Sequence, residues 1–525
     1  MSLENGKNRS WRETLVACTH PKVLAMLFLG FSSGLPLYLI FSSLSAWLTQ
    51  AGVSKASVTF FSWAALGYSF KFIWAPLVDL LPLPFLTRLL GRRRGWLLLS
   101  QVLVAVAIMW MGMTNPVGSS GGLTVMALAA VMLGFSAATQ DIVIDAYRIE
   151  SSIESMQALL ASTYIAGYRI GMLVSGAGSL YLAGWLGSSK GLYVYSAWKY
   201  TYLIMGVIML TGIITTLCIS EPGQSKERKY SDYSTEQYLR IVLLFAAATV
   251  TFALAFFFSG SISDELKKLV EDHFPVAGVL VGLGVEILRF LSAVLIAGFV
   301  CRLLVQLKLV AWEMVHQVYV RPVLDFFTRY EVKAAVLLLM LIGCYRISDV
   351  VMGVVANVFY LELGFSTIDI ANISKTFGLL MTIAGGFLGG VLTVRYGVIK
   401  ILFLGALLSA ATNLLFMTLA KAGANLSLLT VVIMADNLSG GIATTAFVAF
   451  LSSLTSVSFT AMQYAIFSSV MLLFPKTIGG YSGTIAENFG YETFFLITAC
   501  MGIPVLLLVW LVRDYVDKGK ESTES

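Results

Sequence analysis

Several ionisable side chains in this sequence stand inside long apolar runs. Arg169 lies in the stretch Gly167-Tyr-Arg-Ile-Gly171, and in a later run Arg346 is followed by Asp349. A charged group at the centre of a bilayer costs about 2.5–3.5 kcal/mol on insertion scales, so such groups normally face a bundle interior or a water-filled cavity. A guanidinium also binds a carboxylate through two parallel hydrogen bonds. These residues predict a polar site for an anionic solute inside a membrane protein.

The candidate substrate-binding residues are cations and amides within or close to the apolar runs. The cations suit an anion, and the amides suit hydroxyl and peptide groups. The expected set is Lys71, Gln140, Arg169, Arg346, Asn357, Lys375, Asn437 and Gln463. Alternative roles are a fixed ion pair of Arg169 with Asp141 or Asp145, and hydrogen bonds between helices for the amides.

Three carboxylates are placed deepest in these runs, and they are the candidates for proton coupling: Asp141, Asp349 and Asp436. A proton-coupled carrier needs a carboxylate that is protonated in one state and ionised in another. A structural alternative exists for each. Arg346 shares a helix face with Asp349 and can neutralise it, Asp141 can anchor Arg169, and Asp436 can join a network with Asn437.

A second charge cluster is expected at the membrane surface, where it would act as a cytoplasmic gate. Its members are Asp79, Arg92, Arg93, Arg94, Asp145, Arg148 and Glu150. The alternative is ordinary pairing of surface charges, which contributes little free energy.

The elements that must position these residues are membrane-spanning helices. Of 525 residues, 58% are hydrophobic and 12% are charged, against about 25% charged in soluble domains. Continuous apolar runs of about 20 residues predict helices rather than the alternating strands of a barrel. We expect about fourteen spans: 23–48, 58–80, 96–114, 122–145, 156–184, 198–219, 239–259, 275–304, 334–361, 369–394, 400–420, 426–450, 456–485 and 491–513.

The distribution of lysine and arginine predicts the topology. Residues at or next to a span end are assigned to the adjoining junction or terminus. Of the 35 lysines and arginines, six then fall in odd-numbered junctions, 22 at the two ends or in even-numbered junctions, and seven within spans. Because positive residues favour the cytoplasmic side, both termini are expected in the cytoplasm. The positive net charge of +6 therefore reflects topology rather than a nucleic-acid partner. The first apolar run is too long for a cleaved signal peptide.

Enzymatic chemistry is not expected. The three histidines, His20, His273 and His316, fall outside the spans, and no serine or cysteine has a plausible histidine partner. The five scattered cysteines form no CxxC pair, so neither a disulfide nor a metal site is predicted. No GxxxxGK[ST] phosphate loop occurs, which argues against an ATP pump. We therefore expect no cofactor and an ion gradient as the energy source.

The spans divide as six, two and six. We expect a six-helix bundle over 1–219, a linker with two additional helices over 220–333, and a second six-helix bundle over 334–525. The two blocks repeat a short basic loop with glycine after their second span: Gly91-Arg-Arg-Arg-Gly95 in the first and Arg395-Tyr-Gly397 in the second. Such repeats are typical of transporters.

Together these features resemble the major facilitator superfamily and, within it, the AmpG family of muropeptide permeases. The matching stretches are Lys71-Phe-Ile-Trp-Ala-Pro-Leu-Val-Asp79, Gly91-Arg-Arg-Arg-Gly-Trp96, Gln140-Asp-Ile-Val-Ile-Asp145, Gly167-Tyr-Arg-Ile-Gly-Met-Leu-Val-Ser-Gly176, Lys375-Thr-Phe-Gly378, Asn437-Leu-Ser-Gly-Gly441 and Ala446-Phe-Val-Ala449. The resemblance covers both six-span blocks, while the middle pair departs from the usual twelve helices.

The resemblance implies an all-α membrane protein with two six-helix bundles and about two extra helices. It implies alternating-access import of anhydromuropeptides from periplasm to cytoplasm by proton symport, in the bacterial inner membrane, by a monomer. It also implies a place in peptidoglycan recycling, which supplies the ligands that control β-lactamase induction. The alternatives are a carrier of another bulky anion, such as a coenzyme A ester, or a membrane-embedded transferase acting on a cell-wall precursor.

Overall fold

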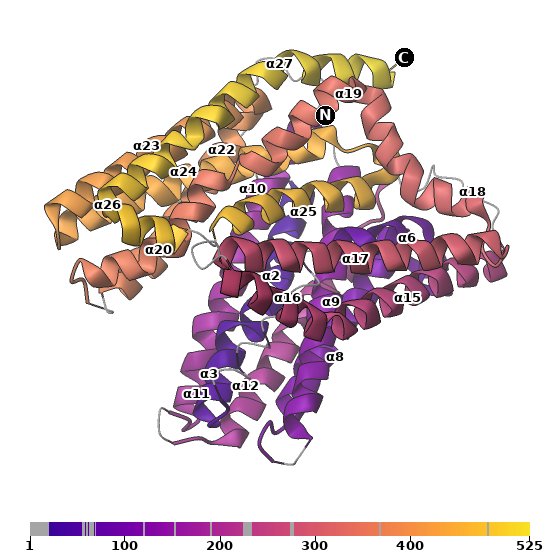
Figure 1. The fold of residues 1–525 in the computed structure, drawn as a ribbon, viewed down its shortest axis with the longest axis horizontal. Helices are drawn as coiled ribbons and strands as arrows, with labels where there is room; N and C mark the ends of the chain where they lie inside the picture. Colours follow the sequence, from indigo (N-terminus) through magenta and orange to yellow (C-terminus); the bar gives the residue numbers. More distant parts are fainter. Residues whose placement is uncertain are drawn as a thin grey trace. The chain divides into compact units, whose positions relative to one another are not determined.

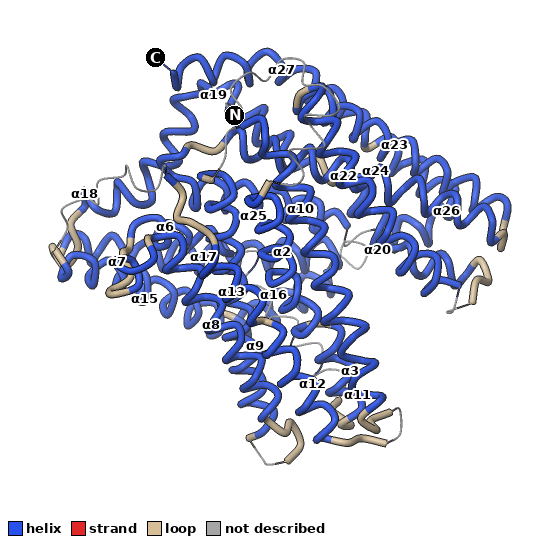
Figure 2. Tube along the Cα trace, turned by 180° about the vertical axis from the view of Figure 1, so that it is seen from behind, coloured by secondary structure: helices blue, strands red, loops and turns tan. Residues whose placement is uncertain are grey.

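The computed structural model describes residues 20–54, 58, 61, 68, 70–118, 121–151, 154–189, 192–223, 234–273, 278–366, 369–479 and 482–524. Throughout these ranges the regular structure is helical (Figure 2), and the one β-type pairing is an isolated bridge between Ser189 and Leu192. The all-α fold expected from the continuous apolar runs is confirmed.

The chain divides into two compact units. One unit is formed by residues 1–228 together with 326–525, and the other by residues 229–325. The helices of both expected six-helix blocks therefore belong to one unit, and the inserted helices form the other. In Figure 1 the colours identify the two blocks. The first runs from indigo to magenta, and the second from salmon to yellow.

The described helices of the first block begin at residue 21 and end at residue 218. They are α2 (Pro21–Ile40), α3 (Ser42–Gln50), η2 (Lys71–Ile73), α6 (Ala75–Leu80), α7 (Leu86–Leu90), α8 (Arg92–Met113), α9 (Gly122–Glu150), α10 (Glu154–Leu173), η3 (Val174–Gly178), α11 (Ser179–Trp185), α12 (Tyr195–Ile208) and α13 (Leu210–Cys218). Helix α2 starts with Pro21, because a proline is well tolerated in the first turn of a helix. The side chain of the preceding His20 accepts a hydrogen bond from the N–H of Lys22.

The second block has the same helical character. Its helices are α19 (Arg321–Cys344), α20 (Ile347–Glu362), η6 (Ile370–Phe377), α22 (Gly378–Tyr396), α23 (Val398–Ala422), α24 (Leu426–Leu454), η7 (Val457–Phe459), α25 (Thr460–Gly479), α26 (Ser482–Cys500) and α27 (Gly502–Glu524). The side chain of Asn425 caps the first turn of α24 by accepting from the N–H of Leu428. Helix α23 packs against α24 and α26 (Figure 1).

Two glycines give the repeated basic loops the same backbone conformation. Gly91 precedes α8 with φ 92° and ψ 171°, and Gly397 precedes α23 with φ 89° and ψ 157°. A positive φ with an extended ψ is essentially restricted to glycine. The similarity of the two loops, expected from their sequences, therefore extends to their backbones.

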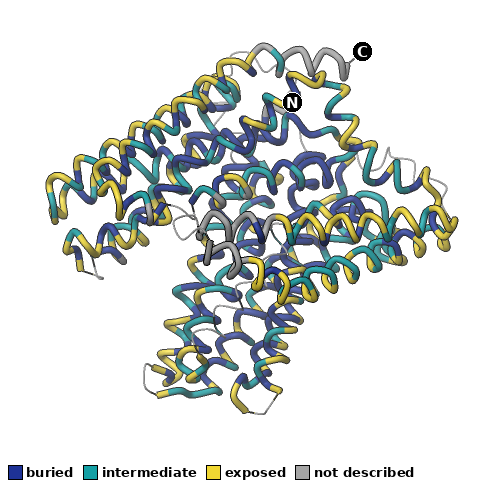
Figure 3. Tube along the Cα trace, in the orientation of Figure 1, coloured by how far each residue is buried: buried dark blue, intermediate teal, exposed yellow. Residues whose placement is uncertain are grey.

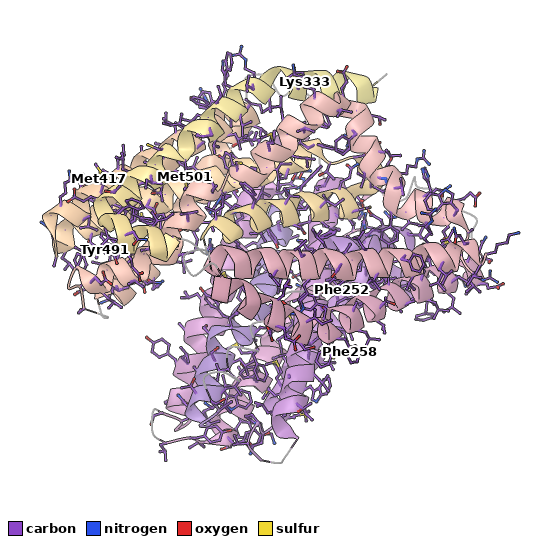
Figure 4. The ribbon with its side chains drawn as sticks, in the orientation of Figure 1. Phe252, Phe258, Lys333, Met417, Tyr491 and Met501 are labelled. Carbon is purple, nitrogen blue, oxygen red and sulfur yellow. The ribbon has the colours of Figure 1, made fainter. Side chains whose placement is uncertain are left out.

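The inserted unit is built on two long helices, α15 (Thr235–Phe258) and α17 (Gly278–Gln306), with α16 (Gly260–His273) between them and α18 (Trp312–Val315) and η5 (His316–Val320) after them. Ser234 and Gln237 form a reciprocal capping box at the start of α15. Figure 4 labels Phe252 and Phe258 on α15, and the Phe252 ring lies 5.6 Å from Phe290 of α17 in an edge-on contact. Aromatic contacts thus help to hold the pair together.

Thirteen helical segments among the described residues are long and apolar enough to cross a membrane. Each overlaps one of the fourteen expected spans. The remaining expected span, 58–80, is described only in part, at positions 58, 61, 68 and 70–80. Many large apolar side chains on the outer faces of the helices are exposed (yellow in Figure 3), as is required where helices face lipid rather than water.

We predict that both termini lie in the cytoplasm, as the charge distribution indicates. Ser189 is exposed in an odd-numbered junction, and Ser458 is exposed in the short turn between α24 and α25, next to the even-numbered junction 451–455. In a variant without the five native cysteines, Ser189→Cys should react with a membrane-impermeant thiol reagent in intact cells, and Ser458→Cys only after the membrane is opened. The opposite pattern would invert the topology. Ser263 is a poor probe because only 4% of it is exposed.

Candidate functional site

A cavity of about 340 Å³ brings together seven of the candidate residues. Its lining includes Arg169, Arg346, Asp349, Asn357, Lys375, Asp436 and Asn437. Most of these belong to α20, η6 and α24 of the second block, whereas Arg169 comes from α10 of the first. Three cations and two carboxylates therefore share one polar cavity at the junction of the blocks.

Arg169 is positioned by an unusually close crossing of α10 and α2. A Cβ atom on Gly167 or Gly171 would collide with the backbone of α2, and one on Gly30 or Gly34 would collide with the backbone of α10. Glycine on both helices is what allows the two backbones to touch. Gly30 and Gly34 therefore serve the packing of the two helices.

The side chain of Arg169 is unpaired within the described part of the chain. No hydrogen bond or ion pair joins it to another described residue, and neither Asp141 nor Asp145 is its partner. The alternative role of a fixed ion pair with these carboxylates is thus not what this conformation contains. An arginine that lines a polar cavity without a partner is available to bind an anion.

Arg346 and Asp349 form the ion pair that their spacing of three residues allows. Arg346 Nε lies 3.4 Å from Asp349 Oδ2, and both side chains are partly exposed to the cavity. Arg346 also donates a hydrogen bond to Thr444 of α24. The pair therefore spans α20 and α24 on the cavity wall, and Arg346 is already partly neutralised.

Asp436 and Asn437 contribute neighbouring polar groups from α24. Thr412 of α23 donates to Asp436 Oδ1 over 3.4 Å, while Asn437 accepts from Thr382 of α22 over 2.9 Å and donates to the C=O of Ile433 over 3.0 Å. Asn437 is consequently both a cavity residue and a link between helices. Among the described residues, Asp436 has only the long contact with Thr412, and it keeps acceptor capacity toward the cavity.

Lys375 and Asn357 line the cavity with exposed side chains. Lys375 lies in η6, a π-helical segment that precedes the α-helical part of the same span. Irregular segments of this kind are frequent at functional sites.

Three candidates from the first block do not line the cavity. Lys71 is buried, with its Nζ 3.7 Å from Asp145. Asp141 is buried and accepts a hydrogen bond from Ser33 of α2. Gln140 is buried and donates to Ser32 over 2.9 Å. The charges that correspond between the blocks in sequence are therefore used differently, since only those of the second block reach the cavity.

Gln463 also lies away from the cavity, at the start of α25. Its Oε1 accepts from the N–H of Ser456 over 2.7 Å and from Arg329 Nη2 over 3.0 Å. Gln463 thus makes hydrogen bonds between chain segments, which is the alternative role given above for the amides.

Arg93 is the centre of the expected gate cluster. Its side chain is fully buried and donates to both oxygens of Glu150, over 2.9 and 2.5 Å, and to Asp79 over 2.6 Å. Asp79 in turn accepts from the N–H of Met462 in α25 over 3.1 Å. This cluster links α6, α8 and α9 of the first block to α25 of the second.

Arg148 makes a second connection between the blocks. It is fully buried, donates to Ser452 of α24 over 2.7 Å, and lies 5.2 Å from the centre of the Tyr464 ring. Its Nη2 is 3.4 Å from Asp145, which also pairs with Lys71. These charges are thus buried where the two blocks touch.

The three consecutive arginines have different environments. Arg92 donates to the C=O of Asp79 over 2.6 Å and lies 3.9 Å from Glu150. Arg94 instead donates to the carbonyl oxygens of Thr216 and Leu217 at the end of α13. Both acceptors of Arg94 therefore belong to the first block.

Some site residues were missed by the sequence analysis. Glu221 accepts from the backbone N–H groups of Arg93 and Arg94 over 2.9 and 3.1 Å, and so caps α8 after Gly91. Tyr360, Ser374, Thr382 and Thr444 line the cavity. Glu221 could not be predicted as a cap, because an acidic residue after a span has no distinctive sequence pattern. The hydroxyl residues could not be predicted either, because such residues are common in membrane helices.

Comparison with known proteins agrees with this architecture. The model of the Major Facilitator Superfamily matches residues 26–312 and 337–525. A putative transporter AmpG 4 from Rickettsia conorii is 29% identical over 496 residues, 94% of this chain and 97% of the relative. The anhydromuropeptide permease of Escherichia coli K12 is 30% identical over 499 residues, 95% of this chain and 81% of that permease.

Solved structures show the same fold. The proton:xylose symporter XylE bound to 6-bromo-6-deoxy-D-glucose gives a TM-score of 0.55 at 15% identity and covers 95% of this chain and 94% of its own. The transporter FucP in the outward conformation gives 0.58 at 12% identity, with 94% and 99% covered.

We predict that Arg93→Ala destabilises the protein far more than Arg94→Ala. Removing Arg93 leaves the buried carboxylates of Glu150 and Asp79 without their main cation, which costs about 3–5 kcal/mol for a buried pair. Removing Arg94 deprives only two carbonyl oxygens of a donor. Thermal unfolding of the purified variants should show a clearly lower midpoint for Arg93→Ala. Equal midpoints would contradict the central role of Arg93.

Proposed function

Since this chain belongs to the Major Facilitator Superfamily and, within it, to the family of AmpG-type permeases, we propose that it imports anhydromuropeptides from the periplasm into the cytoplasm. These fragments of the cell wall combine sugars with a short peptide that ends in a carboxylate. The proposal assigns the chain to secondary transport rather than to an enzymatic reaction, and it places the protein in the inner membrane.

The observation that carries the proposal is the guanidinium of Arg169, which has no partner among the described residues and lies in a cavity that also holds Arg346 and Lys375. A peptide carboxylate bound by Arg169 would gain two charge-assisted hydrogen bonds. The neighbouring amides of Asn357 and Asn437, together with the hydroxyls of Tyr360 and Thr444, can bind hydroxyl and peptide groups. The cavity thus combines an anion site with uncharged polar groups.

Alternating access requires contacts that close one side of the cavity and later separate. We assign this role to the connections made by Asp79 and Arg148, because each joins the first block to the second. The predicted topology puts them on the cytoplasmic side. In the present conformation they are formed, which corresponds to a carrier closed toward the cytoplasm.

Proton coupling is proposed for the carboxylates of the cavity. Asp349 and Asp436 both line it, so a proton and a substrate would share one site. Asp141 lies apart, beside Ser33 and near the Lys71–Asp145 pair, and is the candidate closest to the gate. In this scheme the transporter acts as a monomer, since each chain contains its own cavity.

Uptake by purified protein in liposomes tests the proposal. A labelled anhydromuropeptide should accumulate unchanged when the outside is acidic, and accumulation should fall when the pH gradient is abolished. Competition by a coenzyme A ester but not by an unlabelled muropeptide would redirect the proposal to that anion. Conversion of the substrate into another compound would instead indicate an enzyme.

We predict that Arg169→Ala abolishes uptake while the protein still inserts and folds. Arg169→Lys should restore only part of it, because an ammonium cannot form the two-point contact of a guanidinium. Arg302→Ala is a suitable control, since Arg302 is exposed on α17 and does not line the cavity. Substrate binding measured by calorimetry separates affinity from turnover. Wild-type uptake by Arg169→Ala would remove this residue from the site.

We also predict that one of Asp141→Asn, Asp349→Asn and Asp436→Asn loses accumulation driven by a pH gradient but keeps downhill exchange of labelled substrate. Asparagine preserves the shape of the side chain and removes its titration, whereas exchange needs only binding and reorientation. The ratio of accumulation to exchange in liposomes measures this. Gradient-driven accumulation by all three variants would place the proton site elsewhere or exclude the proton as the driving ion.

A further inference from the structure

The inserted unit contains a cavity of its own, independent of the transport site. It has a volume of about 370 Å³ and lies where the start of α15 meets the end of α17 and the following turn. Its charged lining residues are Arg240, Lys308 and Glu313, and its aromatic residue is Trp312. The cavity is therefore at the ends of two apolar helices, which is the level of the lipid headgroups.

Two charges of opposite sign in this cavity lack a partner. No hydrogen bond or ion pair connects the side chain of Lys308 or Glu313 to another residue of the described chain, whereas Arg240 pairs with Glu236 over 2.5 Å. Both side chains are exposed. The cavity thus offers one free ammonium and one free carboxylate, besides an arginine that is partly neutralised.

The backbone at Lys308 indicates that its position is constrained. Lys308 has φ 58°, in the left-handed region that strongly favours glycine. Its N–H donates to the C=O of Val305 over 2.9 Å, and the N–H of Leu309 donates to the C=O of Leu304 over 3.1 Å, which is the Schellman pattern at the end of α17. Glycine adopts this conformation at a lower conformational energy than lysine does. The presence of a lysine here therefore supports a role for the Lys308 side chain.

The surroundings of the cavity suit a lipid. Trp312 is 55% exposed, as is typical of tryptophan at a membrane interface. On α15, Leu239 and Leu243 flank Arg240 and are 57% and 58% exposed, and on α17 Leu307 is 61% exposed. Acyl chains beside a bound headgroup would therefore meet apolar side chains.

We propose that this cavity binds the headgroup of a zwitterionic phosphoethanolamine lipid. The phosphate accepts hydrogen bonds from Lys308 and Arg240, and the primary ammonium donates to Glu313. The ring of Trp312 offers a further contact for the ammonium, because cations bind aromatic faces. The inserted helices thereby hold a structural lipid.

Charge complementarity selects this headgroup over the other common ones. A phosphatidylglycerol headgroup would satisfy Lys308, but its uncharged glycerol offers no cation to Glu313. A phosphatidylcholine headgroup carries the right charges but has no N–H to donate to Glu313. Only a headgroup with both a phosphate and a primary ammonium pairs each free charge.

The test is native mass spectrometry of the full-length protein purified in detergent. The protein is titrated with phosphatidylethanolamine, phosphatidylglycerol or phosphatidylcholine of identical acyl chains. Lys308→Gln should weaken binding of the first phosphatidylethanolamine about threefold to fivefold, as expected for loss of one exposed charge contact, and should also weaken phosphatidylglycerol. Glu313→Gln should weaken phosphatidylethanolamine by a similar factor without weakening phosphatidylglycerol.

The matched control is Arg302→Gln, which removes an exposed charge on α17 outside the cavity and should change none of these affinities. Wild-type affinity for phosphatidylethanolamine in both cavity variants would overturn the proposal. So would an equal loss of phosphatidylglycerol binding in Glu313→Gln. Displacement of the lipid by inorganic phosphate would show a site for free phosphate instead.

Discussion

The cost of placing a charge in hydrocarbon governs how this protein is built. Each ionisable group within a span must be paired, hydrogen-bonded or given access to water. The buried cations of the first block meet this requirement through carboxylates: Lys71 through Asp145, and Arg93 through Glu150 and Asp79. Arg169 meets it through access to a cavity. The same constraint therefore accounts both for the buried ion pairs of the first block and for the polar cavity that Arg169 lines.

The two repeated blocks have divided their tasks. Both carry a lysine on the second span and an aspartate on the fourth, but Lys375 and Asp436 face the cavity while Lys71 and Asp141 are buried away from it. Among its described residues, the first block then supplies a single lining residue, Arg169, held by the glycine crossing of α2 and α10. A rigid crossing suits a residue whose guanidinium must keep a fixed direction. The second block surrounds the rest of the cavity.

The sequence was most informative where the signal is local. Continuous apolar runs predict the spans, and charges inside them predict which side chains line the cavity, as for Arg346 and Asp349. Rotation of a helix is harder to predict, because one residue turns the direction of a side chain by about 100° and a largely apolar helix gives little periodicity. For this reason the sequence predicts Gln463 and Lys71 as substrate-binding residues, whereas the structure places both away from the cavity. The three consecutive arginines could not be ranked either, since Glu221 and the carbonyls of α13 are distant in sequence from them.

The charge of the cavity has an electrical consequence. Arg169, Arg346 and Lys375 face Asp349 and Asp436, so with all five groups ionised the empty cavity carries one excess positive charge. A membrane potential acts on such a charge with about 2.3 kcal/mol per 100 mV for a full crossing. When the interior is negative, the field favours the empty carrier with its cavity connected to the cytoplasm and opposes its return. A bound monoanion cancels that excess, and a proton bound with it restores one positive charge. In the proposed proton symport, voltage would therefore favour the loaded step and oppose the return of the empty carrier.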